Sequence, residues 1–179
     1  MRWYLDTEFL EDGKTIELIS IALVNDPGTV EYYAGDAECD LSRVMTDEWL
    51  RQHVVPHLPS FDRGRGPVGN EGTFWKPKAE IGRDLLRLFG MVAGKFNETP
   101  EIWADHASYD WVALCQIYGR MIDLPRGMPM FCMDLMQDLR QRGIRRSDLP
   151  KQDPKTEHDA LADARWLRSA HRYVQGFNW

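Results

Sequence analysis

Residues 2–34 read RWYLDTEFLEDGKTIELISIALVNDPGTVEYYA, and this stretch decides the fold. It holds three apolar runs, rich in the β-branched and aromatic side chains that favour β-strands, at residues 2–5, 16–24 and 29–34. Two tight-turn signals separate them, Asp12-Gly13 and the Asn-Asp-Pro-Gly sequence of residues 25–28. The stretch therefore predicts an antiparallel meander of three strands, the first of which ends at Asp6.

Helical and strand patterns alternate in the rest of the chain. The expected helices cover residues 46–56, 77–92, 108–118, 134–142 and 159–174, with Thr46 as the cap of the first, and the expected strands cover residues 101–104 and 130–133. Residues 59–77 are rich in glycine and proline and predict a long flexible loop. A meander followed by alternating helices and strands indicates an α/β fold, with a mixed sheet flanked by helices.

The composition bounds the class of protein. The chain has 179 residues, of which 43% are hydrophobic and 28% charged, a balance typical of one globular domain covering residues 1–179. No apolar run is long enough to span a membrane, and the first residues do not resemble a secretion signal. Three cysteines without a C-x-x-C spacing favour a reducing compartment, the cytoplasm, over a disulfide framework or a zinc site.

Charge is unevenly distributed along the chain. The net charge of −6 argues at first against a nucleic-acid partner. Residues 140–155, however, hold six basic residues against two acids, a net charge of +4, which leaves −10 for the rest. This basic segment is either a solvated loop or a surface that follows phosphates. Acids that hold divalent cations would also make the chain less negative than its sequence suggests.

The first strand carries a candidate metal site. Asp6 and Glu8 stand two residues apart, so in a strand both carboxylates point to the same face and can reach one cation. Mg²⁺ and Mn²⁺ prefer such oxygen ligands. Chance is the alternative, because the chain has 28 acidic residues and one such pair carries little information.

Two further patterns place acids where helices begin. Asp105 and Asp110 follow the apolar run of residues 102–104, where they could serve a site or cap a helix and favour its dipole. Asp163 lies close to the apolar face of the last helix, and a carboxylate there is costly unless a metal or another group pairs with it. His158, five residues earlier, is suited to accept a proton near neutral pH. The alternative is a helix start with an exposed histidine.

In this order the patterns resemble the DEDD superfamily of 3′→5′ exonucleases, in its histidine subclass. The resemblance rests on Asp6-x-Glu8, Tyr109-Asp110 and His158-x4-Asp163, which extend over nearly the whole chain. Residues 5–9 and 15–21 are also similar to the ribonuclease AS group, actinobacterial exoribonucleases that prefer adenylate-rich RNA. The resemblance implies a ribonuclease H-like sheet and removal of nucleoside 5′-monophosphates from single-stranded RNA 3′ ends.

The resemblance also implies roles for the acids. Two divalent ions, Mg²⁺ or Mn²⁺, would be held by Asp6 between them, by Glu8 and Asp163 on the side of the attacking water, and by Asp110 on the other side. His158 would take the proton of that water. Relatives often have asparagine four or five residues before the middle aspartate, where this chain has Asp105. Asp110 keeps the pairing of an aromatic residue with aspartate and is the expected ligand, and Asp105 is an auxiliary acid or its replacement.

The substrate contacts are expected around the first and middle motifs. The backbone of Thr7 and the carboxylate of Glu8 could read the ribose 2′-hydroxyl, which distinguishes RNA from DNA. Phe9 could stack on the terminal base or belong to the core, and Trp111 and Trp75 could be further stacking platforms. Residues 140–155 and 59–77 could follow the upstream phosphates.

Two other functions compete with this reading. One is an exodeoxyribonuclease of the same superfamily. The other is an inactive fold that only binds RNA or a protein, which the clustered acids disfavour because they would repel phosphates. Relatives are often dimers, so the resemblance implies a homodimer, and the tail at residues 177–179 could contribute to its contact.

Overall fold

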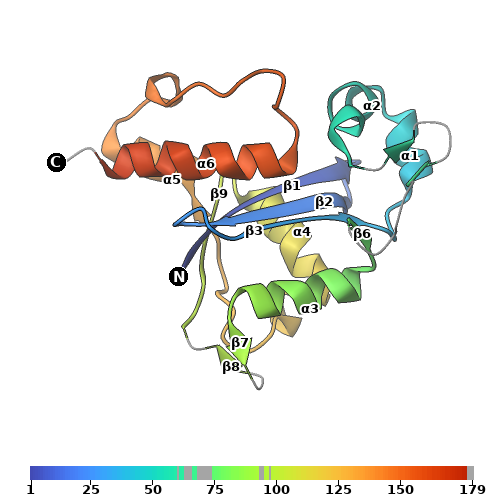
Figure 1. Cartoon of the computed structure of the whole chain (residues 1–179), viewed down its shortest axis with the longest axis horizontal. Helices are drawn as coiled ribbons and strands as arrows, with labels where there is room; N and C mark the ends of the chain where they lie inside the picture. Colours follow the sequence, from blue (N-terminus) through green and yellow to red (C-terminus); the bar gives the residue numbers. More distant parts are fainter. Residues whose placement is uncertain (60, 63–65, 68–73, 93–94, 97, 177–179) are drawn as a thin grey trace.

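A six-stranded mixed sheet forms the centre of the protein (Figure 1). The computed structural model describes residues 1–59, 61–62, 66–67, 74–92, 95–96 and 98–176. The strands of the sheet follow the order β10-β9-β1-β2-β3-β6, and helices cover both faces. The expected α/β fold, an antiparallel meander extended by parallel strands and flanked by helices, is confirmed and agrees with a ribonuclease H-like architecture.

The meander consists of β1 (Arg2–Glu11), β2 (Ile16–Asn25) and β3 (Glu31–Asp36). Both predicted turns are present, with the backbone N–H of Gly28 donating to Asn25 at 2.9 Å and a left-handed φ of 75° at Gly28. The predicted end of the first strand at Asp6 was wrong. β1 continues to Glu11 because β2 pairs with it along its whole length, across a register shift between Glu8 and Phe9. Asp6 and Glu8 therefore lie inside the strand.

Parallel strands extend the meander on both sides. β9 (Glu101–Ala104) pairs with the first residues of β1, β10 (Met133–Asp134) pairs with β9, and β6 (Trp75–Lys76) pairs with β3. The expected loop at residues 59–77 thus contributes a strand to the main sheet. It also holds the small ladder of β4 (Phe61–Asp62) and β5 (Gly66–Pro67), and its other residues between 60 and 73 lie outside the described part. A second small ladder joins β7 (Met91–Val92) and β8 (Lys95–Phe96).

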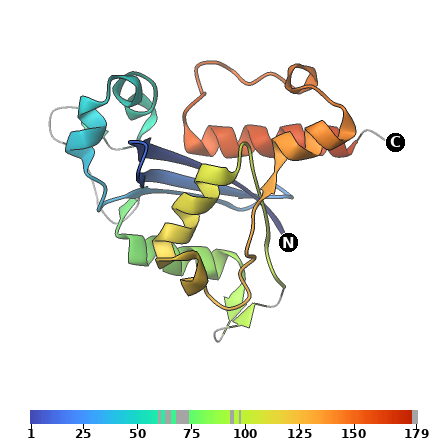
Figure 2. The same cartoon turned by 180° about the vertical axis from the view of Figure 1, so that it is seen from behind.

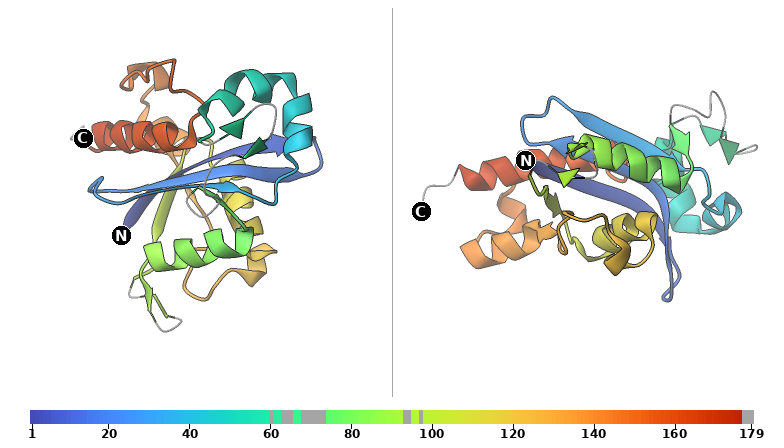
Figure 3. Two further views of the ribbon diagram at one scale, coloured as in Figure 1. Left: turned by 45° about the vertical axis from the view of Figure 1, so that its right-hand side comes forward. Right: turned by 90° about the horizontal axis from the view of Figure 1, so that it is seen from below.

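The helices form two layers around the sheet (Figures 2 and 3). On one face, α3 (Lys78–Leu88) and α4 (Ser108–Tyr118) cover a core that includes Leu5 and Leu23. On the other face, α6 (Ala160–Gln175) and α5 (Leu135–Arg142) enclose Tyr4 and Trp103. None of the helices that the structure describes is both long and apolar enough to cross a membrane.

Two short helices, α1 (Leu41–Thr46) and α2 (Glu48–His53), stand beside the start of α6 (Figure 1). The prediction of Thr46 as the cap was displaced by one residue, because Asp47 accepts the backbone N–H of Leu50 at 2.9 Å. The described residues also contain single turns of 3₁₀-helix at Val55–His57, Met121–Asp123 and Arg146–Asp148.

Candidate active site

The middle of β1 is hydrogen-bonded to β2 on one side but to no described strand on the other. The pairing of β1 with β9 stops at Tyr4, so no strand among the described residues pairs with this edge of β1 from Leu5 onward. Asp110 from the first turn of α4 occupies this edge. Its Oδ1 accepts both the backbone N–H of Thr7, at 2.9 Å, and the hydroxyl of Thr7, at 2.7 Å. The end of β9 thus lets a carboxylate from one face of the sheet reach the first strand.

The other face of β1 receives the start of α6. Ala160 and Ala164 are fully buried and pack with Ala22 and Val24 of β2. Small side chains let a helix approach a sheet closely. Because Ala22 is the partner of Asp6 in the ladder, this packing sets Asp163 beside the acids of β1.

Asp163 is fixed through both of its oxygens. The backbone N–H of His158 donates to Oδ2 at 3.0 Å, and the side chain of Gln152 donates to Oδ1. His158 has a left-handed φ of 67°, a conformation that residues other than glycine seldom adopt. It lies just before Asp159, which caps α6 by accepting the backbone N–H groups of Leu161 and Ala162.

The structure brings the acids of the three motifs to one place. Ligand atoms of Glu8, His158 and Asp163 lie within 4.8 Å of one another. Asp6 and Asp110 line the same cavity as these three residues. Glu8 and Asp110 are nearly buried, with 7% and 6% of their surfaces exposed.

Burial and mutual repulsion disfavour the charged forms of these carboxylates when no cation is bound. Burial, followed by the charges of Asp110 and Glu8, raises the pKa of Asp6 well above its usual range. Burial and the charge of Asp163 do the same to the pKa of Glu8. Burial raises the pKa of Asp110 to about 7, although the hydrogen bonds from Thr7 act in the opposite direction.

Burial also raises the pKa of Asp163, against the lowering effect of its donors Gln152 and His158. In the described residues no lysine or arginine forms an ion pair with Asp6, Glu8, Asp110 or Asp163. Four carboxylates without a basic partner are a set of oxygen donors that fits hard divalent cations.

Aromatic side chains border the acids in a cavity of about 320 Å³. Phe9 and Tyr109 are in edge contact, with ring centroids 5.6 Å apart. Trp49 of α2, half of whose surface is exposed, contacts the ring of His158 at 4.8 Å. Trp49 could not be recognised from the sequence, because nothing along the chain indicates that α2 reaches the start of α6.

The other residues that were predicted to contact the substrate differ in whether they reach the cavities. Asp105 lines the aromatic cavity and a larger neighbouring one. Trp75 is buried against other core residues and donates its indole N–H to Pro59 at 3.2 Å. Trp111 packs against the core formed with α4 and lines neither cavity. The backbone N–H of Thr7 is already bonded to Asp110.

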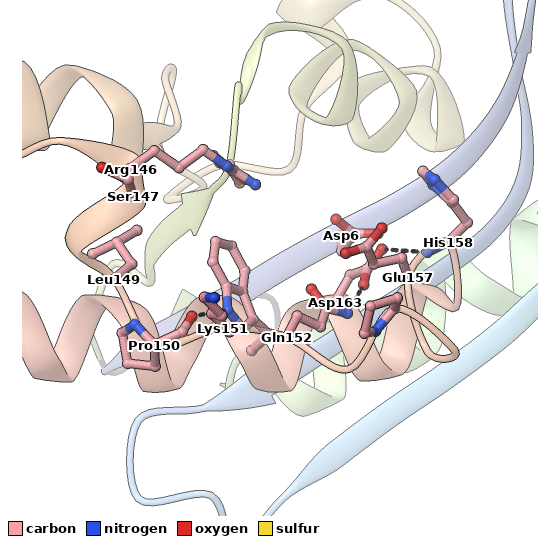
Figure 4. Close-up of a pocket in the computed structure, with 13 residues that line it drawn as sticks. Asp6, Arg146, Ser147, Leu149, Pro150, Lys151, Gln152, Glu157, His158 and Asp163 are labelled. Carbon is pink, nitrogen blue, oxygen red and sulfur yellow. Dashed lines mark hydrogen bonds and ion pairs between the residues drawn. The ribbon is translucent and has the colours of Figure 1, made fainter.

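The larger cavity has a volume of about 560 Å³ and shares Asp6, Asp105, His158 and Asp163 with the aromatic one. Figure 4 shows Asp6, Asp163 and His158 at one end of this cavity, and Arg146 and Lys151 away from that end. Gln152, which sequence reasoning missed, lies between these two groups, on the connection that leads into α6.

Comparison with known proteins shows which family the chain resembles. The model of the 3′-5′ exoribonuclease Rv2179c-like domain matches residues 1–175. Two proteins of Mycobacterium tuberculosis, 3′-5′ exoribonuclease Rv2179c of strain H37Rv and 3′-5′ exoribonuclease MT2234.1 of strain CDC 1551, are each 42% identical to this chain over 168 residues. The match covers 92% of this chain and 88% of each relative. The chain therefore belongs to the Rv2179c-like 3′-5′ exoribonuclease domain family.

Proposed function

We propose that this protein is a divalent-metal-dependent 3′→5′ exoribonuclease of the histidine subclass of the DEDD superfamily. Its substrate is the 3′ end of single-stranded RNA, and its product is a nucleoside 5′-monophosphate. One observation carries the proposal: acids from β1, α4 and α6 line one cavity together with His158, and no lysine or arginine of the described residues forms an ion pair with them. The family and the names of the relatives support the reaction and the substrate class.

Asp6, Glu8, Asp110 and Asp163 are the residues that would hold two Mg²⁺ or Mn²⁺ ions. Such ions, when bound, act as Lewis acids on phosphate oxygens and favour deprotonation of an attacking water. The chain prepares the acids for this role. Thr7 orients Asp110, and Gln152 with the backbone of His158 orients Asp163.

His158 is the group that takes the proton from the attacking water. Its backbone is fixed to Asp163, and its ring contacts Trp49 at 4.8 Å and lies 5.9 Å from His53. These contacts orient the imidazole at the border of the two cavities, where a scissile phosphate can meet the acids. An oriented base accelerates hydrolysis by about 10²–10⁴-fold.

The aromatic cavity is the proposed site of the 3′-terminal nucleoside. Phe9, Trp49 and Tyr109 offer ring faces and edges for stacking, the usual way to hold single-stranded bases. Because the N–H of Thr7 is bonded to Asp110, Glu8 is the better candidate to recognise the ribose 2′-hydroxyl. The likeness of residues 5–9 to adenylate-preferring enzymes, together with the stacking strength of a purine, supports a preference for adenylate.

We further propose that the protein works as a homodimer in the cytoplasm. Exposed apolar side chains gather in the connection between α4 and α5 and suggest a surface for a second copy: Met121, Ile122, Met130, Phe131 and Met133. The tail at residues 177–179 lies outside the described residues. Three free cysteines suit a reducing compartment.

A digestion assay tests the reaction. The protein is incubated with a 5′-labelled oligoadenylate and with DNA of the same sequence, with Mg²⁺, Mn²⁺ or a chelator. We expect a ladder of single-nucleotide steps from the 3′ end of RNA that the chelator stops. Asp6→Asn and Asp163→Asn should abolish it, whereas Asp123→Asn, an exposed aspartate paired with Arg120, should not.

The outcomes separate the competing functions. Digestion of DNA but not RNA would identify an exodeoxyribonuclease. Binding of RNA without cleavage under any metal condition would identify a binding module, and full turnover by Asp163→Asn would contradict the assignment of the acids.

A further inference from the structure

The two cavities determine the direction in which a bound RNA strand runs through the site. They share Asp6, Asp105, His158 and Asp163, so a phosphate at the acids has one cavity on each side. The aromatic cavity, of about 320 Å³, suits one terminal nucleoside. The strand must then leave through the larger cavity, of about 560 Å³, which carries Arg146 and Lys151.

We propose that Arg146 binds the phosphate immediately upstream, on the 5′ side, of the scissile phosphate. This inference rests on the proposed function, because it assumes that cleavage occurs at the acids. The ligand is a phosphate monoester or diester attached to the penultimate nucleoside of the RNA.

Arg146 is held in place by groups other than a phosphate. Its Nη1 donates to Asp105 and lies 3.5 Å from the sulfur of Met136. Its guanidinium carbon stands 4.9 Å above the ring of Trp166. A guanidinium that is stacked and anchored loses little freedom when it binds a ligand, which favours planar recognition of phosphate.

Arg146 still has N–H donors that are available for a ligand. Both hydrogen bonds of its side chain to the described residues use Nη1, so Nε and Nη2 have no partner among those residues. Figure 4 shows the side chain extended into the cavity, toward the end where Asp6 lies. Lys151 adds a second cation without a partner in the described part of the chain. This end of the cavity is therefore complementary to an anion.

A path for a longer strand continues beyond Arg146. Arg146 also lines a third cavity, of about 480 Å³, together with Arg140 and Arg145. Arg145 is already paired with Asp148, at 2.9 Å, whereas Arg146 alone borders both cavities. Arg146 is thus a cation at the junction between the cavity of the acids and this third cavity.

Two diadenylates test the inference, because they differ only in the group concerned. One has a 5′-phosphate and the other a 5′-hydroxyl. In the first, the 5′-phosphate occupies the upstream position, and both have the same scissile bond. We expect the wild-type protein to favour the phosphorylated dinucleotide by about tenfold in kcat/KM. Arg146→Gln should reduce this ratio to near one, and Arg146→Lys should keep part of it.

Controls separate the subsite from general effects of charge. Arg87→Gln removes an exposed cation from α3, on the opposite face of the sheet, and should keep the wild-type ratio. Arg146→Gln combined with Asp105→Asn removes both members of the ion pair. If the double variant recovered the preference, Arg146 would only neutralise Asp105, and the inference would be overturned.

The other possible results of the dinucleotide experiment also decide whether Arg146 forms this subsite. A wild-type protein without preference, or an Arg146→Gln variant with the wild-type ratio, would overturn the subsite while leaving exonuclease activity intact. If the wild type cleaved neither the dinucleotides nor the oligoadenylate, the proposed function would fail. The subsite would then be decided by equilibrium binding of the two dinucleotides in Ca²⁺, where the same loss of preference in Arg146→Gln is expected.

Discussion

Thr7 and Gln152 show how single residues prepare the acids. Each donates to a carboxylate, Thr7 to Asp110 from one face of the sheet and Gln152 to Asp163 from the other. The acids could be selected as candidates because each belongs to a short pattern within one element or at its start. The donors could not, because Thr7 and Asp110 are 103 residues apart and no local pattern links Gln152 to Asp163.

At Gln152 we expect an effect on turnover rather than on folding. Gln152→Leu removes the donor to Asp163 Oδ1, so the carboxylate loses its fixed orientation. kcat should fall by about tenfold, the usual effect of removing an outer partner of a metal ligand. Gln152→Glu should be worse, because it adds a like charge. An unchanged kcat in steady-state kinetics, with normal thermal stability, would exclude this role.

At Asp110 the metal-free protein should be less stable at higher pH. The folded-state pKa is about 7, above the value of about 4 in an unfolded chain, so the folded state binds more protons between these values. The contribution of Asp110 to stability is therefore present at low pH and is lost as pH rises toward 7.

The substitution Asp110→Asn removes the ionisable carboxyl group and therefore the loss of folding stability at higher pH. In a chelator at pH 8 we expect the variant to melt on the order of 5 °C above the wild type, with the difference shrinking toward pH 4. Mg²⁺ should raise the melting temperature of the wild type but not of the variant. A difference in calorimetry that does not depend on pH would contradict the stated cause.

Among the elements, α6 and β1 determine the geometry of the site. Helix α6 approaches β2 through Ala160 and Ala164, and His171 further along accepts or donates a hydrogen bond at 2.9 Å to Tyr4 of β1. The meander and the helices α3, α4, α5 and α6 could be predicted from local periodicity and turn residues, whereas α1 was not predicted. The full length of β1 and the strand β6 could not, because both depend on pairing with distant segments.

The close approach of α6 gives a prediction for this element. Ala164→Leu inserts a large side chain between α6 and the sheet, so it should displace Asp163 and lower stability by about 1–3 kcal/mol. At a temperature where the variant is folded, its activity should still be much lower than that of the wild type. Ser169→Leu, at an exposed position of the same helix, is the control. Equal activities of the two folded variants would argue against this packing as the determinant of the site.

For the whole molecule, the proposed dimer gives a separate prediction. Phe131 has 63% of its surface exposed and Ile122 has 71%, which is unusual for large apolar side chains. Phe131→Asp should convert a dimer into a monomer in light scattering, whereas Val30→Asp, at another exposed apolar position, should not. A wild-type mass of about 21 kDa at all concentrations would contradict the homodimer.

The convergence of the acids on divalent cations is the claim on which the other proposals depend. Crystals grown with Mn²⁺ test it most directly, because anomalous scattering locates the ion without assumptions about activity. We expect two peaks bonded to carboxylates of the set Asp6, Glu8, Asp110 and Asp163, and their loss in Asp6→Asn. Well-ordered crystals in which Mn²⁺ leaves these four residues unbound would contradict the account.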